Sequence, residues 1–209
     1  MFQHFDPKTF LIGLIVIILS IALHEFGHAF SADRLGDDTP RRQGRVTLWP
    51  DKHFEPVGFL MIVFTMLAGF GLGWGKPVQV NDRNFRHPNR DMIIVTICGP
   101  LMNLLLAVIA GLIMRYVPLA GYSYLFARDF LFINLALMFF NLIPIPPLDG
   151  SKVLYGLLPY DLAVRYERFM GQFGLILLLL ILFTNVIGQI IGPATFRTAY
   201  LLAGNGLFG

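Results

Sequence analysis

The amino-acid sequence predicts an all-α polytopic membrane protein. We expect about four full transmembrane helices, one re-entrant or interfacial segment and a small membrane-associated β element. Of the 209 residues, 56% are hydrophobic and only 14% are charged, whereas a soluble domain carries about a quarter charged residues. The mean hydropathy is +0.65, and apolar runs of membrane length recur along the chain. This length suits a single membrane-embedded domain that covers residues 1–209.

Four apolar segments are predicted to form the long helices, because a spanning helix needs about 20 predominantly apolar residues. These segments cover residues 9–31, 92–114, 122–150 and 173–191. The third segment includes Arg128 and Asp129, and it ends in a run of prolines that cannot continue a regular helix.

The region 41–91 is predicted to contain the β element and the re-entrant segment. Gly44–Pro50 and Lys76–Asn81 are bounded by turn residues and read as two short strands that pair or flank each other. Between them, Val57–Gly75 is apolar but ends with four glycines in seven residues. Glycine disfavours a helix, so we expect this segment to re-enter or to lie in the interface.

Composition excludes several function classes. With one cysteine, Cys98, the chain can form no internal disulfide and no cysteine-rich zinc site. The net charge of +3 is explained by membrane orientation and anionic lipid, so we expect no nucleic-acid partner.

The sequence His24-Glu25-Phe26-Gly27-His28 lies inside the first apolar segment. On a helix, an HExxH pattern places two imidazoles on one face, where both can bind one Zn²⁺, and places the Glu to take a proton from a water molecule at the metal. Ionisable residues are costly inside a bilayer and usually serve a function there. The pattern therefore predicts a zinc hydrolase whose site lies at or below the membrane surface.

A catalytic zinc usually has three protein ligands, and the spacing of the chain leaves the third one open. The candidates are Asp33, Asp37, His53, His87 and Asp149. Asp149 follows an apolar segment in Asn-Leu-Ile-Pro-Ile-Pro-Pro-Leu-Asp-Gly, where unwound backbone at membrane depth is tolerated only against protein or a polar cavity. An ordinary turn at a membrane exit explains Asp149 equally well.

The two motifs together resemble the site-2 protease family of intramembrane zinc metalloproteases, in its compact type without a PDZ domain. Three further segments occur in the order expected for that family: Gly44–Leu48, Gly73–Val78 and Gly99–Asn103. The resemblance covers roughly residues 20–160. Trp49 is a departure, because family members often have a small polar residue there.

The resemblance implies a role for each site residue. His24, His28 and Asp149 would bind one Zn²⁺ per chain, and Glu25 would act as the general base. Asn141 would position the substrate or the oxyanion. Asn103 would support packing or the surroundings of the metal ligands. For either Asn, an ordinary hydrogen bond between helices is the alternative interpretation.

Topology gives a separate expectation. If Val57–Gly75 does not cross the membrane, two crossings separate the histidines from Asp149, so both lie on one side. That arrangement also places most of the 16 Lys and Arg residues on the side of the site, whereas a crossing would divide them evenly. The positive-inside rule then puts the site near the cytoplasmic face.

The expected function is zinc-dependent hydrolysis of peptide bonds in or near transmembrane segments of membrane-protein substrates, which is regulated intramembrane proteolysis. The expected partners are a transmembrane protein substrate and the lipid bilayer, and the expected setting is a bacterial or archaeal cell membrane. The alternatives are a non-proteolytic zinc transporter or sensor and a structural membrane protein with a chance motif. The sequence specifies neither the substrate nor the oligomeric state.

Overall fold

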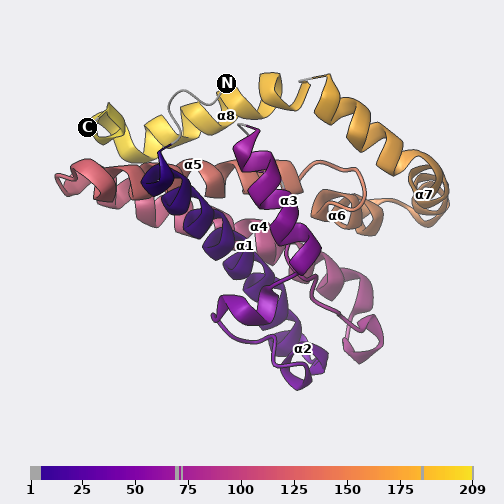
Figure 1. Cartoon of the computed structure of the whole chain (residues 1–209). Coiled ribbons are helices and arrows are strands. Elements are labelled where there is room, and N and C mark those ends of the chain that lie inside the picture. The colour runs from indigo at the N-terminus through magenta and orange to yellow at the C-terminus, as the bar shows by residue number, and fades with distance from the viewer. Residues whose placement is uncertain (1–5, 69–70, 72, 185, 209) are drawn as a thin grey trace.

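The computed structural model describes residues 6–68, 71, 73–184 and 186–208, and these residues form helices and connecting segments with no strand. Figure 1 shows the arrangement. The α-helices are α1 (Pro7–Leu35), α2 (Thr39–Arg42), α3 (Pro56–Leu67), α4 (Pro88–Tyr116), α5 (Gly121–Asn141), α6 (Asp149–Leu157), α7 (Tyr160–Phe183) and α8 (Val186–Ala203). Short 3₁₀ turns are η1 (Pro50–His53), η2 (Asp82–Asn84) and η3 (Gly204–Phe208).

Local sequence signals set the ends of α1, the helix that carries the HExxH motif. The Asp6 carboxylate accepts hydrogen bonds from the backbone N–H groups of Lys8 and Thr9, and Pro7 occupies the first helical position. Both features are typical of helix starts. Gly36 ends the helix in the left-handed conformation with φ 112°, which glycine adopts without a steric penalty. The helix therefore runs unbroken through both histidines.

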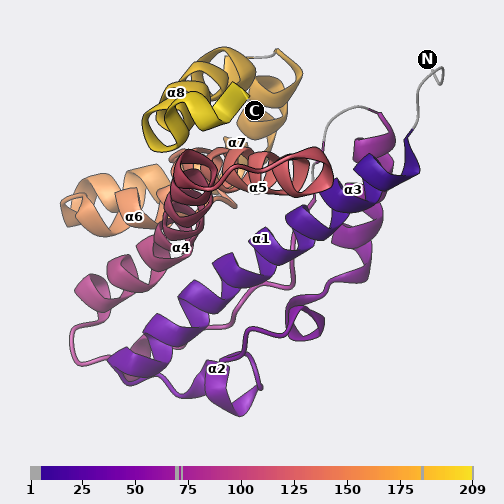
Figure 2. The same cartoon turned by 90° about the vertical axis from the view of Figure 1, so that its left-hand side faces the viewer.

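Helices α1, α4 and α5 form the centre of the molecule, with α3 on one flank of α1, α6 on α4, α8 on α4 and α5, and α7 in contact with both α6 and α8 (Figures 1 and 2). Between α4, α5 and α8 lies an apolar core. At the crossing of α1 and α4, a Cβ on Gly27 would lie only 2.6 Å from the carbonyl oxygen of Cys98. Glycine at position 27 therefore lets α4 pack directly against the helical turn that contains the motif.

Among the described residues, three helices are long and apolar enough to cross a membrane: α1, α4 and α5. A fourth crossing is not confirmed. Residues 173–191, expected as one helix, are divided between the end of α7 and the start of α8, and residue 185 lies outside the described part. Thr184 lies at this break, and its hydroxyl donates a hydrogen bond to the Leu180 carbonyl.

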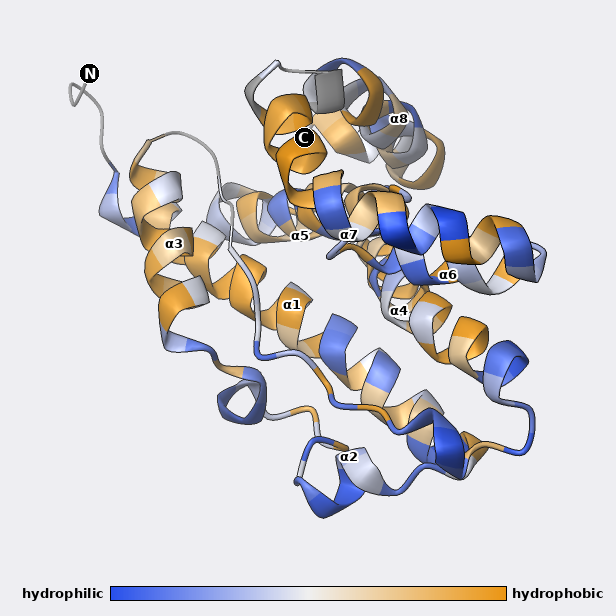
Figure 3. Ribbon diagram, turned by 90° about the vertical axis from the view of Figure 1, so that its right-hand side faces the viewer, coloured by the Kyte–Doolittle hydropathy of each residue, from blue (hydrophilic) through white to orange (hydrophobic). Residues whose placement is uncertain are grey.

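Figure 3 shows the hydrophobic residues along α3 and the first half of α1, and hydrophilic residues around α2.

The apolar segment expected at Val57–Gly75 is a short helix followed by a returning chain. Helix α3 has 12 residues, which is about 18 Å at 1.5 Å per residue and short of the roughly 30 Å hydrocarbon core. Residues 69, 70 and 72 of this expected segment lie outside the described part. Gly58 lies against the Trp74 carbonyl, and the Lys76 N–H donates to the His53 carbonyl at 2.9 Å. The two ends of this segment therefore lie side by side.

The two expected strands are not found, which corrects the predicted β element. Residues 44–50 form turns and bends, and residues 76–81 are extended without a ladder. The physical reason is that side chains take the backbone donors that a neighbouring strand would need. The Val78 N–H donates to Glu25 Oε2 at 3.0 Å, and the Asn81 N–H donates to Asp37 Oδ2 at 2.8 Å.

Candidate metal centre

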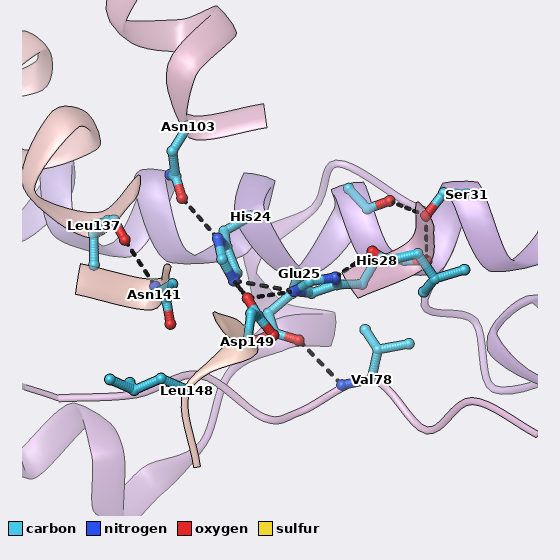
Figure 4. Close-up of polar contacts among 12 residues, drawn as sticks. His24, Glu25, His28, Ser31, Val78, Asn103, Leu137, Asn141, Leu148 and Asp149 are labelled. Atoms are coloured by element: carbon cyan, nitrogen blue, oxygen red, sulfur yellow. Dashed lines mark hydrogen bonds and ion pairs between the residues drawn. The ribbon is translucent and has the colours of Figure 1, made fainter. Parts of the chain in front are cut away.

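Three side chains from two helices converge on one point in the interior. His24 and His28 lie one turn apart on α1, and Asp149 is the first residue of α6. Asp149 Oδ2 lies 3.1 Å from His24 Nε2 and 3.2 Å from His28 Nε2, and the two Nε2 atoms are 3.1 Å apart. The three residues are only 7–9% exposed. Figure 4 shows their polar atoms facing one another.

The proline-rich connection after α5 delivers Asp149 to this point. Ile145 and Leu148 are buried in an apolar cluster with Leu178 of α7, which fixes the connection between α5 and α6. Gly150 lies directly against the Leu142 carbonyl, so that a Cβ there would collide with it. The carboxylate therefore projects from a connection whose path is set by packing rather than from a free turn.

Each histidine is oriented by a hydrogen bond from its other ring nitrogen. His28 Nδ1 lies 2.8 Å from the Val95 carbonyl, and His24 Nδ1 lies 2.6 Å from Asn103 Oδ1. Since both partners are acceptors, both Nδ1 atoms carry the proton, and each neutral ring presents an Nε2 lone pair to the centre. Such partners fix ring orientation and tautomer in metal sites.

The arrangement fits a cation. With both Nε2 atoms unprotonated, the buried Asp149 Oδ2 has no hydrogen-bond donor among the described residues, and three lone-pair atoms face each other at 3.1–3.2 Å. Zn²⁺ holds such ligands at about 2.0–2.2 Å in tetrahedral geometry, which separates them by about 3.3–3.6 Å. Three converging acceptors without a donor would repel, so a positive ion is the partner that their chemistry requires.

Gly99 of α4 closes the site from the opposite side. A Cβ at this position would collide with His28 Nε2 and would lie 2.8 Å from His24 Cε1. The space beside the two imidazoles therefore exists only because residue 99 has no side chain.

The structure resolves which candidate joins the two histidines. Among the described residues, His24, His28 and Asp149 form the one group of three or more ligand side chains close enough to share a metal ion. The other four candidates have different partners. Asp33 forms an ion pair with Arg41, and Asp37 accepts hydrogen bonds from Thr39 and Asn84. His53 Nε2 lies 2.9 Å from the Thr47 carbonyl oxygen, and His87 is the residue that precedes α4.

Glu25 lies beside the cluster and is held by the returning chain. Its Oε2 accepts the Val78 N–H at 3.0 Å (Figure 4). Arg45, only 4% exposed, donates from its two terminal nitrogens to the carbonyl oxygens of Lys52 and Lys76. The guanidinium thus ties the loop after α2 to the chain that contacts Glu25.

Asn141 lies at the last turn of α5, where its Nδ2 donates to the Leu137 carbonyl at 3.0 Å. This is a bond within its own helix, so the side-chain oxygen has no protein partner assigned to it among the described contacts (Figure 4). Asn103 differs, because it is fully buried and contacts His24 directly.

Comparison with known proteins identifies the family. The model of peptidase family M50 matches residues 120–181. The protein YwhC of Bacillus subtilis (strain 168), named as a candidate zinc metalloprotease, is 34% identical over 189 residues, which is 86% of this chain and 84% of YwhC. The chain belongs to peptidase family M50. This is the site-2 protease family that its motifs resemble, so the protein is a metalloprotease, and its His-His-Asp cluster fits the zinc ion of such enzymes.

Two further M50-type relatives are longer than this chain. The protein Rip2 of Mycolicibacterium smegmatis, also named as a candidate zinc metalloprotease, is 33% identical over 82% of this chain and 66% of its own length. Stage IV sporulation protein FB of Bacillus subtilis is 27% identical over 73% of this chain and 44% of its own length. No solved structure gives a significant match.

Sequence reasoning did not single out Arg45 and Gly99, which contact the site, or Ser20 and Asn134, which are hydrogen-bonded to each other behind Asn103. Arg45 and Gly99 lie inside segments that resemble the family, but their contacts depend on the fold. Asn134 carried one usable signal, since a polar amide inside an apolar helix is costly unless it is hydrogen-bonded.

Proposed function

We propose that this M50 peptidase is a zinc-dependent intramembrane endopeptidase that cleaves peptide bonds in or near transmembrane segments of membrane-protein substrates. One observation carries the proposal. Two of the three candidate metal ligands, His24 and His28, lie with Glu25 on a 29-residue helix that is long and apolar enough to cross a membrane, and Asp149 of α6 meets them there. A peptidase site on such a helix is suited to substrates that are themselves in the bilayer.

His24, His28 and Asp149 would hold one zinc ion per chain. A zinc ion held there would supply Lewis acidity that polarises the scissile carbonyl and makes a water molecule more acidic. Glu25 would accept the proton of the attacking water and pass it to the leaving amine as the peptide bond breaks. The Val78 N–H would keep the Glu25 carboxylate beside the cluster. Asn141 would position the substrate or its developing oxyanion, and Asn103 would orient His24.

The hydrogen bond from the Lys76 N–H to the His53 carbonyl supports a membrane arrangement in which the segment between these residues re-enters. If this segment re-enters on one side, helices α4 and α5 are the two crossings between the histidines and Asp149. The loops around α2 and before α4 are rich in Lys and Arg, which favours a cytoplasmic position for this end. We therefore propose one multi-pass domain in a bacterial or archaeal cell membrane, with the site near the cytoplasmic face.

A transmembrane protein is the proposed substrate, and the surrounding bilayer is the second partner. A non-proteolytic zinc transporter or sensor is less well supported. Transport favours several ligand sets along a path, whereas the described residues contain one such set. A transporter also has no use for a proton-accepting Glu between the two histidines.

Reconstituted protein and a tagged single-span substrate test the proposal. Wild type would be compared with Glu25→Gln, His24→Ala and, as a matched surface control, Asp38→Asn, which removes a carboxylate in an exposed ion pair with Arg42. Cleavage products, zinc content and zinc uptake into the vesicles would be measured in each sample.

We expect wild type and Asp38→Asn to cleave the substrate and to carry zinc. Glu25→Gln should keep the zinc and lose turnover at least hundredfold, because general acid–base catalysis typically contributes 10²–10⁴-fold. His24→Ala should lose both. Zinc transport into vesicles that continues in Glu25→Gln would overturn the assignment in favour of the transporter.

A further inference from the structure

A buried polar network lies behind His24 in the apolar centre of the bundle. It joins Ser20 of α1, Asn103 of α4 and Asn134 of α5, and all three side chains are 0% exposed. The network is continuous with the metal centre through the contact of Asn103 Oδ1 with His24 Nδ1 at 2.6 Å. Three polar side chains meeting between apolar helices are costly unless each is hydrogen-bonded.

The contacts of Asn134 leave its amide one orientation. Its Nδ2 lies 2.8 Å from the Phe130 carbonyl and 2.9 Å from Ser20 Oγ. A backbone carbonyl can only accept, so the amide nitrogen must face Phe130. The Asn134 oxygen then has to face the other way, toward Asn103.

That orientation is passed on to Asn103. Asn134 Oδ1 accepts from Asn103 Nδ2 at 2.8 Å, and the Ser20 carbonyl lies 3.3 Å from the same nitrogen. Both hydrogens of the Asn103 amide are thereby used, and its oxygen must face His24. An oxygen at His24 Nδ1 requires the ring proton to be on Nδ1, which leaves Nε2 free to bind a metal.

We infer that Asn134 is a positioning residue for the metal centre: through Asn103, it sets the tautomer of His24 that leaves Nε2 unprotonated. The inference rests on the proposed zinc site. If Asn134 is replaced by an apolar residue, only the weaker contact at 3.3 Å opposes rotation of the Asn103 amide. A rotated amide would present N–H to Nδ1 and favour the tautomer with Nε2 protonated, which cannot coordinate zinc.

A simple helix-to-helix hydrogen bond is the competing explanation, and a matched variant separates the two. Asn134→Leu keeps a similar side-chain shape and removes the amide. Leu131→Ala removes a fully buried side chain three residues earlier on α5, so it weakens helix packing and leaves the network in place. Ser20→Ala is a milder network variant, because it removes one acceptor of Asn134.

The experiment uses the whole protein in lipid bilayers. Zinc affinity would be measured by competition with a chromogenic chelator, and the imidazole tautomers of ¹⁵N-histidine-labelled protein by solid-state NMR. The samples would be wild type, Asn134→Leu, Ser20→Ala, Leu131→Ala and His24→Ala. Removing a residue that orients a metal ligand typically costs 10–100-fold in metal affinity.

We expect Asn134→Leu to bind zinc about tenfold more weakly and to show a His24 signal from the Nε2-protonated ring, with a smaller change in the same direction for Ser20→Ala. Leu131→Ala should unfold at a lower temperature with unchanged zinc affinity. Equal zinc affinity in wild type, Asn134→Leu and Ser20→Ala, together with loss of binding in His24→Ala, would overturn the role of Asn134 and leave the metal site intact. Unchanged binding in His24→Ala would overturn the metal site itself.

Discussion

Gly99→Ala is the smallest change that the structure predicts will disable the metal centre. The added methyl group would point at both imidazoles from α4, 2.8 Å from His24 Cε1 and in collision with His28 Nε2. Ordinary van der Waals contact begins at 3.4 Å, so the His24 ring would have to retreat by about 0.6 Å, and the His28 ring by more. Neither ring can retreat freely, because each is also hydrogen-bonded through Nδ1.

The magnitude follows from how precisely a metal site is built. Metal–ligand distances are held within about 0.2 Å, so a 0.6 Å displacement of a ligand is well outside that tolerance. Disturbing the groups that orient a metal ligand typically costs about 10–100-fold in metal affinity. We expect Gly99→Ala to bind zinc about a hundredfold more weakly, which corresponds to about 2.8 kcal/mol at 1.4 kcal/mol per tenfold change.

The assay is a zinc titration of purified, chelator-stripped protein, with thermal unfolding measured on the same samples. Gly111→Ala is the matched control, because Gly111 lies on the same helix as Gly99 but away from the cluster, and its Cβ would lie 2.6 Å from Leu202 Cβ of α8. Both variants incur the overpacking cost of about 1–3 kcal/mol, and only Gly99→Ala should lose zinc. A folded Gly99→Ala protein with wild-type zinc affinity would refute the placement of α4 against the histidines.

Two further predictions concern the loops on the proposed cytoplasmic side. Arg45→Lys should lower turnover about tenfold with unchanged zinc content, because an ammonium group cannot reproduce the fork that holds the carbonyl oxygens of Lys52 and Lys76. Arg42→Lys at the exposed ion pair with Asp38 is the control, and equal turnover in both variants would contradict the argument. In a Cys98→Ser background, an Asn84→Cys side chain should react with a membrane-impermeant maleimide in inverted vesicles; reaction in right-side-out vesicles alone would contradict the topology.

Periodicity and composition predict the helices well and the connections poorly. Three of the four long apolar runs became α1, α4 and α5, because in a bilayer-sized apolar segment the backbone can satisfy its hydrogen bonds only within a helix. The strands at 44–50 and 76–81 failed for a long-range reason. Val78 and Asn81 donate to carboxylates on and just after α1, and a local pattern contains no trace of those partners.

The residues of the candidate site also fall into two groups: those that local spacing predicts and those that only the fold identifies. The spacing of His24 and His28 on one helix is a local property and was readable directly. Asp149 was one of five options, because only the fold shows that the chain after α5 turns back to α1. An amide inside an apolar helix marks Asn134 as unusual, but its inferred role could not be read from the sequence, because its partners Asn103 and Ser20 are 31 and 114 positions away in the chain.

The origin of the ligands also affects how the fold is held together. His28 and Asp149 are about 120 residues apart in the chain, and α6 packs mainly on α4 and α7 rather than on α1. A cation bound by both is therefore a cross-link that closes a very long loop, the kind of closure that restricts an unfolded chain most. In this protein the catalytic ion would also stabilise the tertiary structure, so the same three side chains would determine both turnover and resistance to unfolding.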